Sequence, residues 1–150
     1  RLPVKNRPDI FGRQLVMDHT DKVIREEEIL LINATSLSLD EGTALCRSFG
    51  GVCMPAHIDR EANGVISVLG TFPENLGYTC YELSSTGNRQ ELETVYPHLK
   101  ELCCITDSDA HYLWNISGPE NCMELADEPY SSALVRENLL AALEGKFSCQ

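Results

Sequence analysis

The chain has few basic residues and no long apolar run, and each shortage excludes a class of protein. Its 150 residues carry 12 Lys and Arg against 23 Asp and Glu, a formal net charge of −11. Because phosphate backbones and anionic lipids are bound by clusters of Lys and Arg, this balance argues against nucleic acid and membrane surfaces as partners. No apolar run approaches the ~20 residues that a transmembrane helix needs. A small phosphorylated substrate stays compatible, because a metal ion and one Arg supply positive charge locally.

The seven cysteines lack C-x-x-C spacing, which is typical of structural zinc sites and redox motifs. Five of them lie in apolar runs, where a free Cys behaves as a small hydrophobic residue. These are Cys53, Cys80, Cys103, Cys104 and Cys122. We therefore expect reduced thiols and a cytoplasmic protein.

The order of apolar runs and turn signals predicts an α/β fold within one domain over residues 1–150. Residues 1–12 read as an irregular lead-in, and two extended runs at 14–17 and 22–25 flank a polar turn, which predicts a β-hairpin. The lead-in and hairpin together occupy residues 1–28. The apolar run at 29–32 fits either a helix or a strand, because periodicity does not separate them over so short a length.

From Ser38 onward, strands alternate with single helices. Ser38 and Glu41 form a capping box that predicts a helix through Phe49, stopped by Gly50 and Gly51. We expect further helices at 61–69, after Asn88, and from a cap at Ser131 or Ser132 to Gly145. Strands are expected at 52–56, 79–83, 102–105 and, more weakly, 122–125. This alternation predicts parallel βα units, in which functional residues gather at the carboxyl ends of the strands.

Polar residues follow the run at 102–105, with the sequence TDSDAH at 106–111. Asp109 and His111 are two residues apart, so on an extended backbone both side chains leave the same face. A carboxylate oxygen and an imidazole nitrogen together suit a divalent metal such as zinc, manganese or iron. The alternative is a turn in which Asp109 caps the residues that follow.

A second strand end offers similar chemistry. The run at 52–56 leads into His57, and Arg60 follows three residues later. If the two strand ends lie together, His57 is a third candidate ligand. The alternatives are that His57 is a satisfied core histidine and that Arg60 is a solvated residue at the start of a helix.

Together these residues resemble the PHP (polymerase and histidinol phosphatase) family of metal-dependent phosphoesterases, in particular its free-standing bacterial members. The resemblance lies in GGVCMPAHIDR at 50–60, SVLG at 67–70, YELS at 81–84 and SDAHYL at 108–113. It covers the later half of the family pattern, and it implies the later part of a distorted (βα)7 barrel with an inserted hairpin near the N-terminus.

The resemblance implies a role for each matching residue. His57, Asp109 and His111 would bind metal, and Arg60 would bind the substrate phosphate, since its planar fork suits bidentate contact. Asp59 would orient Arg60 or cap a helix. Glu82 would hold a ligating His by a hydrogen bond, or it is a plain carboxylate at the rim.

The family pattern opens with a His-x-His, an Asp-His pair and a metal-binding Glu, and no His-x-His occurs in these residues. The chain is therefore expected to be the C-terminal piece of a phosphoesterase that hydrolyses a phosphate ester through metal-activated water, inactive alone. The alternative is a non-catalytic barrel module that binds a partner. In either case an open barrel edge predicts self-association. Action on nucleic-acid ends, known in the family, is disfavoured by the acidic balance.

Overall fold

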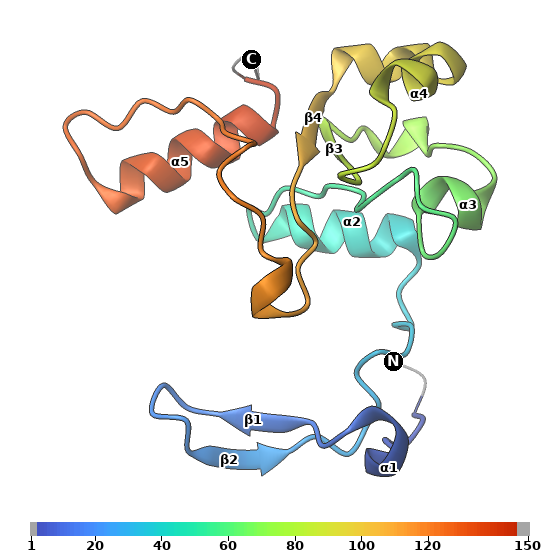
Figure 1. The fold of residues 1–150 in the computed structure, drawn as a ribbon, viewed down its shortest axis with the longest axis vertical. Coiled ribbons are helices and arrows are strands. Elements are labelled where there is room, and N and C mark those ends of the chain that lie inside the picture. The colour runs from blue at the N-terminus through green and yellow to red at the C-terminus, as the bar shows by residue number, and fades with distance from the viewer. Residues whose placement is uncertain (1–2, 147–150) are drawn as a thin grey trace. The chain divides into compact units, whose positions relative to one another are not determined.

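The computed structural model describes residues 3–146, and the chain forms two compact units, Arg1–Gly42 and Thr43–Gln150. Figure 1 shows the path of the chain through its helices and strands. None of the helices within residues 3–146 is both long and apolar enough to cross a membrane.

The first unit contains the expected β-hairpin. Strand β1 (Leu15–Met17) pairs antiparallel with β2 (Val23–Glu26). Asp18 closes the turn, because one of its carboxylate oxygens accepts hydrogen bonds from the backbone N–H of Thr20 at 2.8 Å and of Lys22 at 3.2 Å. An Asp side chain that binds the backbone two residues ahead is a common way to build such a turn.

The lead-in is more ordered than predicted. Residues Pro8–Phe11 form a single helical turn, α1, with Pro8 in the first turn. A Pro there is preorganised for a helix and gives up an N–H that has no helical partner. The run at 29–32 is neither helix nor strand; Ile29 makes one isolated antiparallel bridge to Lys5.

Helix α2 (Leu39–Ser48) begins at the predicted capping box. The Ser38 hydroxyl accepts from the backbone N–H of Glu41 at 3.2 Å, and the Glu41 carboxylate accepts from the backbone N–H of Ser38 at 2.8 Å. The helix stops where Gly50 adopts a φ of +73°, a conformation that costs glycine little.

The second unit is organised around a parallel strand pair. Strand β3 (Cys80–Leu83) pairs in parallel with β4 (Cys103–Thr106), in a register that sets Glu82 beside Ile105. The connection between them passes through helix α4 (Arg89–Val95) and the 3₁₀ turn η2 (Pro97–Glu101) (Figure 1). This is the predicted strand–helix–strand unit. Asn88 caps α4 as expected, accepting from the backbone N–H of Glu91 at 3.2 Å.

The remaining elements are short, apart from the last helix. They are α3 (Val65–Leu69), η1 (Glu74–Leu76), η3 (Leu113–Asn115) and α5 (Ser132–Leu143). Of the two candidate caps, Ser131 and Ser132, it is Ser131 that caps α5, by accepting from the backbone N–H of Leu134 at 3.0 Å.

Three predicted elements differ from the structure. Residues 52–56 are extended but make too few ladder bonds to be a regular strand, and residues 122–125 have no regular structure. The helix expected at 61–69 is confined to Val65–Leu69, because Asn63 has a positive φ of 63° and the chain turns before Gly64. The described residues therefore form a mixed α/β fold with two small sheets, and no barrel is closed.

The cysteine prediction holds in part. Free thiols are present at five of the described cysteines, Cys46, Cys53, Cys80, Cys104 and Cys122. Cys103 is disulfide-bonded, so the expectation of a fully reduced chain is wrong. Burial in an apolar run does not prevent a second sulfur from lying within bonding reach, and sequence spacing does not reveal that reach.

The core of the second unit packs around β3. Its buried side chains come from β3, from η2 and from the loops around α3: Ile58, Phe72, Tyr78, Tyr81, Leu83 and Leu99. Ile58, Tyr81 and Leu99 are fully buried, so these side chains fix β3 against its neighbours.

Leu99→Ala should destabilise the second unit by about 2–5 kcal/mol, because it leaves a cavity in a fully buried position. Leu113→Ala is the matched control, since Leu113 is 85% exposed and should change stability by no more than about 0.5 kcal/mol. Urea unfolding followed by circular dichroism measures both. Equal effects of the two variants would contradict this packing.

Candidate functional site

Polar side chains meet where three parallel segments end. The N–H of Glu82 donates to the Pro55 carbonyl at 3.0 Å, and the N–H of Ile58 donates to the Glu82 carbonyl at 3.0 Å. β3 thus has the segment before His57 on one side and β4 on the other. The carboxyl ends of all three segments lie at one edge, as the βα prediction required.

Asp59 ties the first of these ends to the second. One carboxylate oxygen of Asp59 accepts from the backbone N–H of Ser84 at 2.8 Å, and the other contacts the Ser84 hydroxyl. Burial by itself would raise the pKa of Asp59, but the hydrogen bonds from Ser84 and the charge of Arg60 outweigh it and lower that pKa. Asp59 is therefore a positioning residue that stays ionised.

Gly87 leaves the room that Asp59 needs. A Cβ at position 87 would lie 2.7 Å from an Asp59 carboxylate oxygen and 2.6 Å from the Leu83 side chain. A larger residue there would displace the carboxylate that fastens the end of β3.

Arg60 and Asp109 join the first end to the third. Arg60 Nη1 lies 2.6 Å from Asp109 Oδ2, with the two side chains 46% and 25% exposed. Asp107, and not Asp109, caps the turn, because Asp107 Oδ1 accepts from the backbone N–H of Asp109 at 2.8 Å. The carboxylate of Asp109 is thereby left to face Arg60.

Glu82 brings a buried carboxylate to the same edge. Its burial is the largest cause raising the pKa of Glu82, and the negative charges of Asp107 and, more weakly, Asp109 raise it further. The charge of His57 and a hydrogen bond from the His57 backbone act in the opposite direction. Glu82, Asp107, Asp109, His57 and Arg60 therefore lie within electrostatic reach of one another and form one cluster, here called the strand-end cluster.

The three predicted metal ligands are only partly brought together. His111 lies beside Asp109: its Nδ1 is 2.8 Å from the Asp109 backbone oxygen and 3.9 Å from Oδ1. His57 Nδ1 is buried and has no hydrogen-bond partner among the described residues. Within residues 3–146 no three His, Cys, Asp or Glu side chains form a group able to hold a metal ion. The donor set is therefore incomplete.

The sequence argument missed two features next to this cluster. Asp107 caps the turn and raises the pKa of Glu82. It lies in the same TDSDAH sequence as Asp109. Tyr112 and Trp114 stack with ring centroids 4.8 Å apart and planes 5° from parallel. Both rings are exposed, and both residues lie just after His111 in the sequence. The alternation of aromatic residues after the candidate ligand His111 was the sequence signal that could have indicated this stacked pair.

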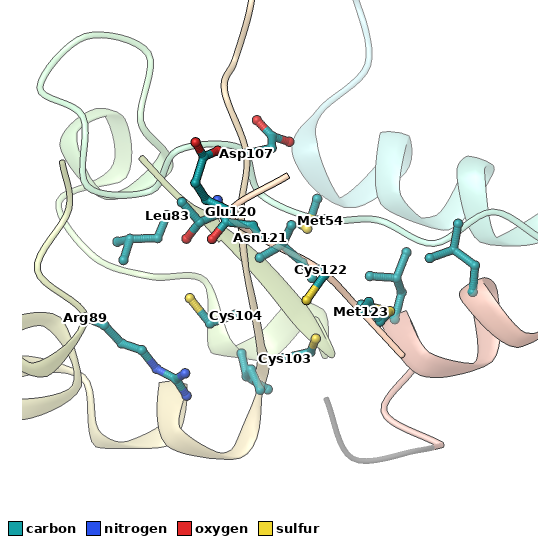
Figure 2. Close-up of a pocket in the computed structure, with 15 residues that line it drawn as sticks. Met54, Leu83, Arg89, Cys103, Cys104, Asp107, Glu120, Asn121, Cys122 and Met123 are labelled. Atoms are coloured by element: carbon teal, nitrogen blue, oxygen red, sulfur yellow. The ribbon is translucent and has the colours of Figure 1, made fainter. Parts of the chain in front are cut away.

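A cavity of about 700 Å³ lies along β4. Figure 2 shows sulfur-bearing side chains along it, from Cys103 and Cys104 of β4 and from Cys122 and Met123 of the later segment. Asp107 lines it as well, so the cavity adjoins the strand-end cluster.

Comparisons with models of protein families, with curated proteins and with solved structures found no match to this chain. A function is therefore inferred from the side chains at the strand ends.

Glu82→Gln should stabilise the protein at neutral pH. Because the folded pKa of Glu82 is raised, folding favours its protonated form, so its stabilising contribution is lost as the pH rises from 4.5 through the folded pKa. Gln resembles the protonated acid and removes this dependence.

The difference in melting temperature between Glu82→Gln and the native chain should be positive at pH 7 and should shrink below pH ~4.3. Glu101→Gln, on an exposed residue, changes the net charge equally and should not show this trend. A lower melting temperature for Glu82→Gln at pH 7 would mean that the buried carboxylate is stabilising.

Proposed function

We propose that this chain supplies part of the active-site rim of a metal-dependent phosphoesterase, a piece of a longer PHP-like protein. The observation that carries the proposal is the ion pair between Arg60 and Asp109 at the strand ends, with His111 beside it. A guanidinium suits a phosphate group, and carboxylate and imidazole are ligands that a divalent metal takes.

Arg60 is the residue for the substrate phosphate. A guanidinium carries five N–H donors, and its ion pair with Asp109 runs through Nη1. The side chain is almost half exposed, so a phosphate oxygen can approach the rest of the fork. The Asp59–Ser84 contact, one residue away, holds the turn from which Arg60 extends.

His57, Asp109 and His111 are the proposed metal ligands, and zinc, manganese or iron is the proposed ion. Such an ion supplies an activated water when it is bound. Since the described residues do not complete a metal site, further ligands must come from elsewhere in the longer protein. For that reason we propose that this chain by itself is inactive.

The cytoplasm is the proposed location, because five of the described cysteines carry free thiols and thiols stay reduced in that compartment.

Hydrolysis of p-nitrophenyl phosphate with added Mn²⁺ or Zn²⁺ tests the proposal. The 150-residue chain should show no turnover, and a longer protein containing it should be active. In that longer protein, Asp109→Asn and His111→Ala should abolish turnover. His19→Ala, at an exposed residue of the first unit, should leave it unchanged. Full activity of the Asp109 and His111 variants would remove the assignment.

A second function, binding of a partner without catalysis, is favoured by the exposed apolar residues Tyr112, Leu113, Trp114 and Ile116. They follow one another along the chain beside His111. Large exposed apolar patches mark interaction sites or association hazards. Together with the edge of β4 that pairs with no strand among the described residues, they predict self-association.

Light scattering over a range of concentrations should show that the chain forms oligomers. Replacing Leu113 and Trp114 with Gln should shift the distribution toward monomer, and replacing the distant exposed Val68 with Gln should not. A monodisperse monomer at all concentrations would contradict association through this patch.

A further inference from the structure

Two cysteines meet where the chain reverses after α2. Cys46 lies in the last turn of α2, and Cys53 lies in the segment that leads to His57. Between them Gly50 takes a positive φ, and the backbone N–H of Gly51 donates to the Cys46 carbonyl at 3.1 Å. A Cβ at position 51 would lie 2.6 Å from Cys46 Sγ. The sulfur of Cys46 therefore lies directly over the returning chain.

Each thiol points at a backbone carbonyl close to the other cysteine. Cys46 Sγ donates to the carbonyl of Val52, the residue before Cys53, at 3.9 Å. Cys53 Sγ donates to the carbonyl of Thr43, one helical turn before Cys46, at 3.7 Å. Burial raises the pKa of the Cys53 thiol, and a hydrogen bond with the Cys46 thiol raises it further. Each sulfur therefore lies against the backbone next to the other cysteine, at the junction of α2 and the segment that leads to His57.

Both cysteines carry free thiols, and both are partly exposed. A small oxidant can therefore reach the pair. Two other described cysteines are placed differently: Cys80 is buried, with its sulfur 4.0 Å from the Cys53 carbonyl, and Cys122 is exposed.

We propose that Cys46 and Cys53 form an oxidisable dithiol, a modification site that closes to a disulfide by exchange with a small disulfide such as oxidised glutathione. One cysteine thiolate attacks a sulfur of the small disulfide, which breaks the S–S bond and releases one small thiolate. The second cysteine thiolate then attacks the mixed disulfide, forms the internal S–S bond and releases the second small thiolate. The two cysteine protons end on the two released thiols, and the small disulfide is reduced.

The new bond would tie the end of α2 to the segment that ends at His57. That segment is extended but irregular, and it contacts β3 through few backbone bonds. Oxidation would therefore restrict the movement of the segment that leads into the strand-end cluster. The proposal does not depend on the phosphoesterase function.

Tryptic mapping after incubation in a glutathione redox buffer tests this site. Cleavage after Arg25, Arg47 and Arg60 places Cys46 alone in peptide 26–47 and Cys53 alone in peptide 48–60. After blocking free thiols, the native chain should give these two peptides joined and lighter by two hydrogens. Addition of a reductant should separate them. The joined fraction should exceed that formed in denaturant by on the order of 10-fold, because the fold holds the thiols together.

Cys122→Ser is the matched control and should leave the joined peptides unchanged, whereas Cys46→Ser should abolish them. Recovery of both peptides singly, as blocked thiols or as separate glutathione adducts, would overturn the proposal. So would a joined product that forms only in denaturant, or one in which Cys53 is linked to Cys80.

Discussion

Strand β3 has a parallel neighbour on each side, and this pairing determines where every functional candidate lies. Glu82 exchanges backbone hydrogen bonds with the segment at 55–58, and its strand is in register with β4. Parallel neighbours present their carboxyl ends at the same edge, so residues separated by some fifty positions in sequence become adjacent. Without that pairing, Arg60 and Asp109 would have no reason to meet. The buried residues Tyr81 and Leu99 hold β3 in place.

Carboxylates outnumber the basic side chains at this edge. Four carboxylates, Asp59, Glu82, Asp107 and Asp109, share it with one guanidinium and the imidazoles of His57 and His111. Arg60 is paired with Asp109, while Glu82 is buried and its pKa is raised. An edge with surplus negative charge is suited to a cation, which is why a metal-assisted reaction is the function we propose.

Much of this fold was predictable because its signals are local. The capping residues Ser38, Asn88 and Ser131 mark helix starts through contacts within three positions. Apolar runs correctly located β3 and β4. Two of the failures were non-local: residues 122–125 have the composition of a strand but find no pairing partner among the described residues, and residues 52–56 pair too sparsely. Strand formation depends on a neighbour that sequence pattern does not supply.

For the site, sequence reasoning predicted His57, Asp109 and His111 as metal ligands and Arg60 as the residue for the substrate phosphate. In the structure Arg60 forms an ion pair with Asp109, and His111 lies beside Asp109. It did not predict the role of Asp107, because two carboxylates in one turn are interchangeable by pattern and are distinguished only by which oxygen faces the backbone N–H of residue 109. The metal ligation and the barrel closure implied by the family resemblance need residues beyond this set, so they stay predictions.

The account depends most on the claim that Glu82, Asp107 and Asp109 share one edge with His57 and Arg60. Carbon-13 NMR titration of the Glu82 side-chain carboxyl tests it directly. We expect a pKa above the ordinary value of 4.5 in the native chain and a fall in that pKa when Asp107 is replaced by Asn. A Glu82 pKa at or below 4.5, unchanged by that replacement, would contradict the convergence of the strand ends.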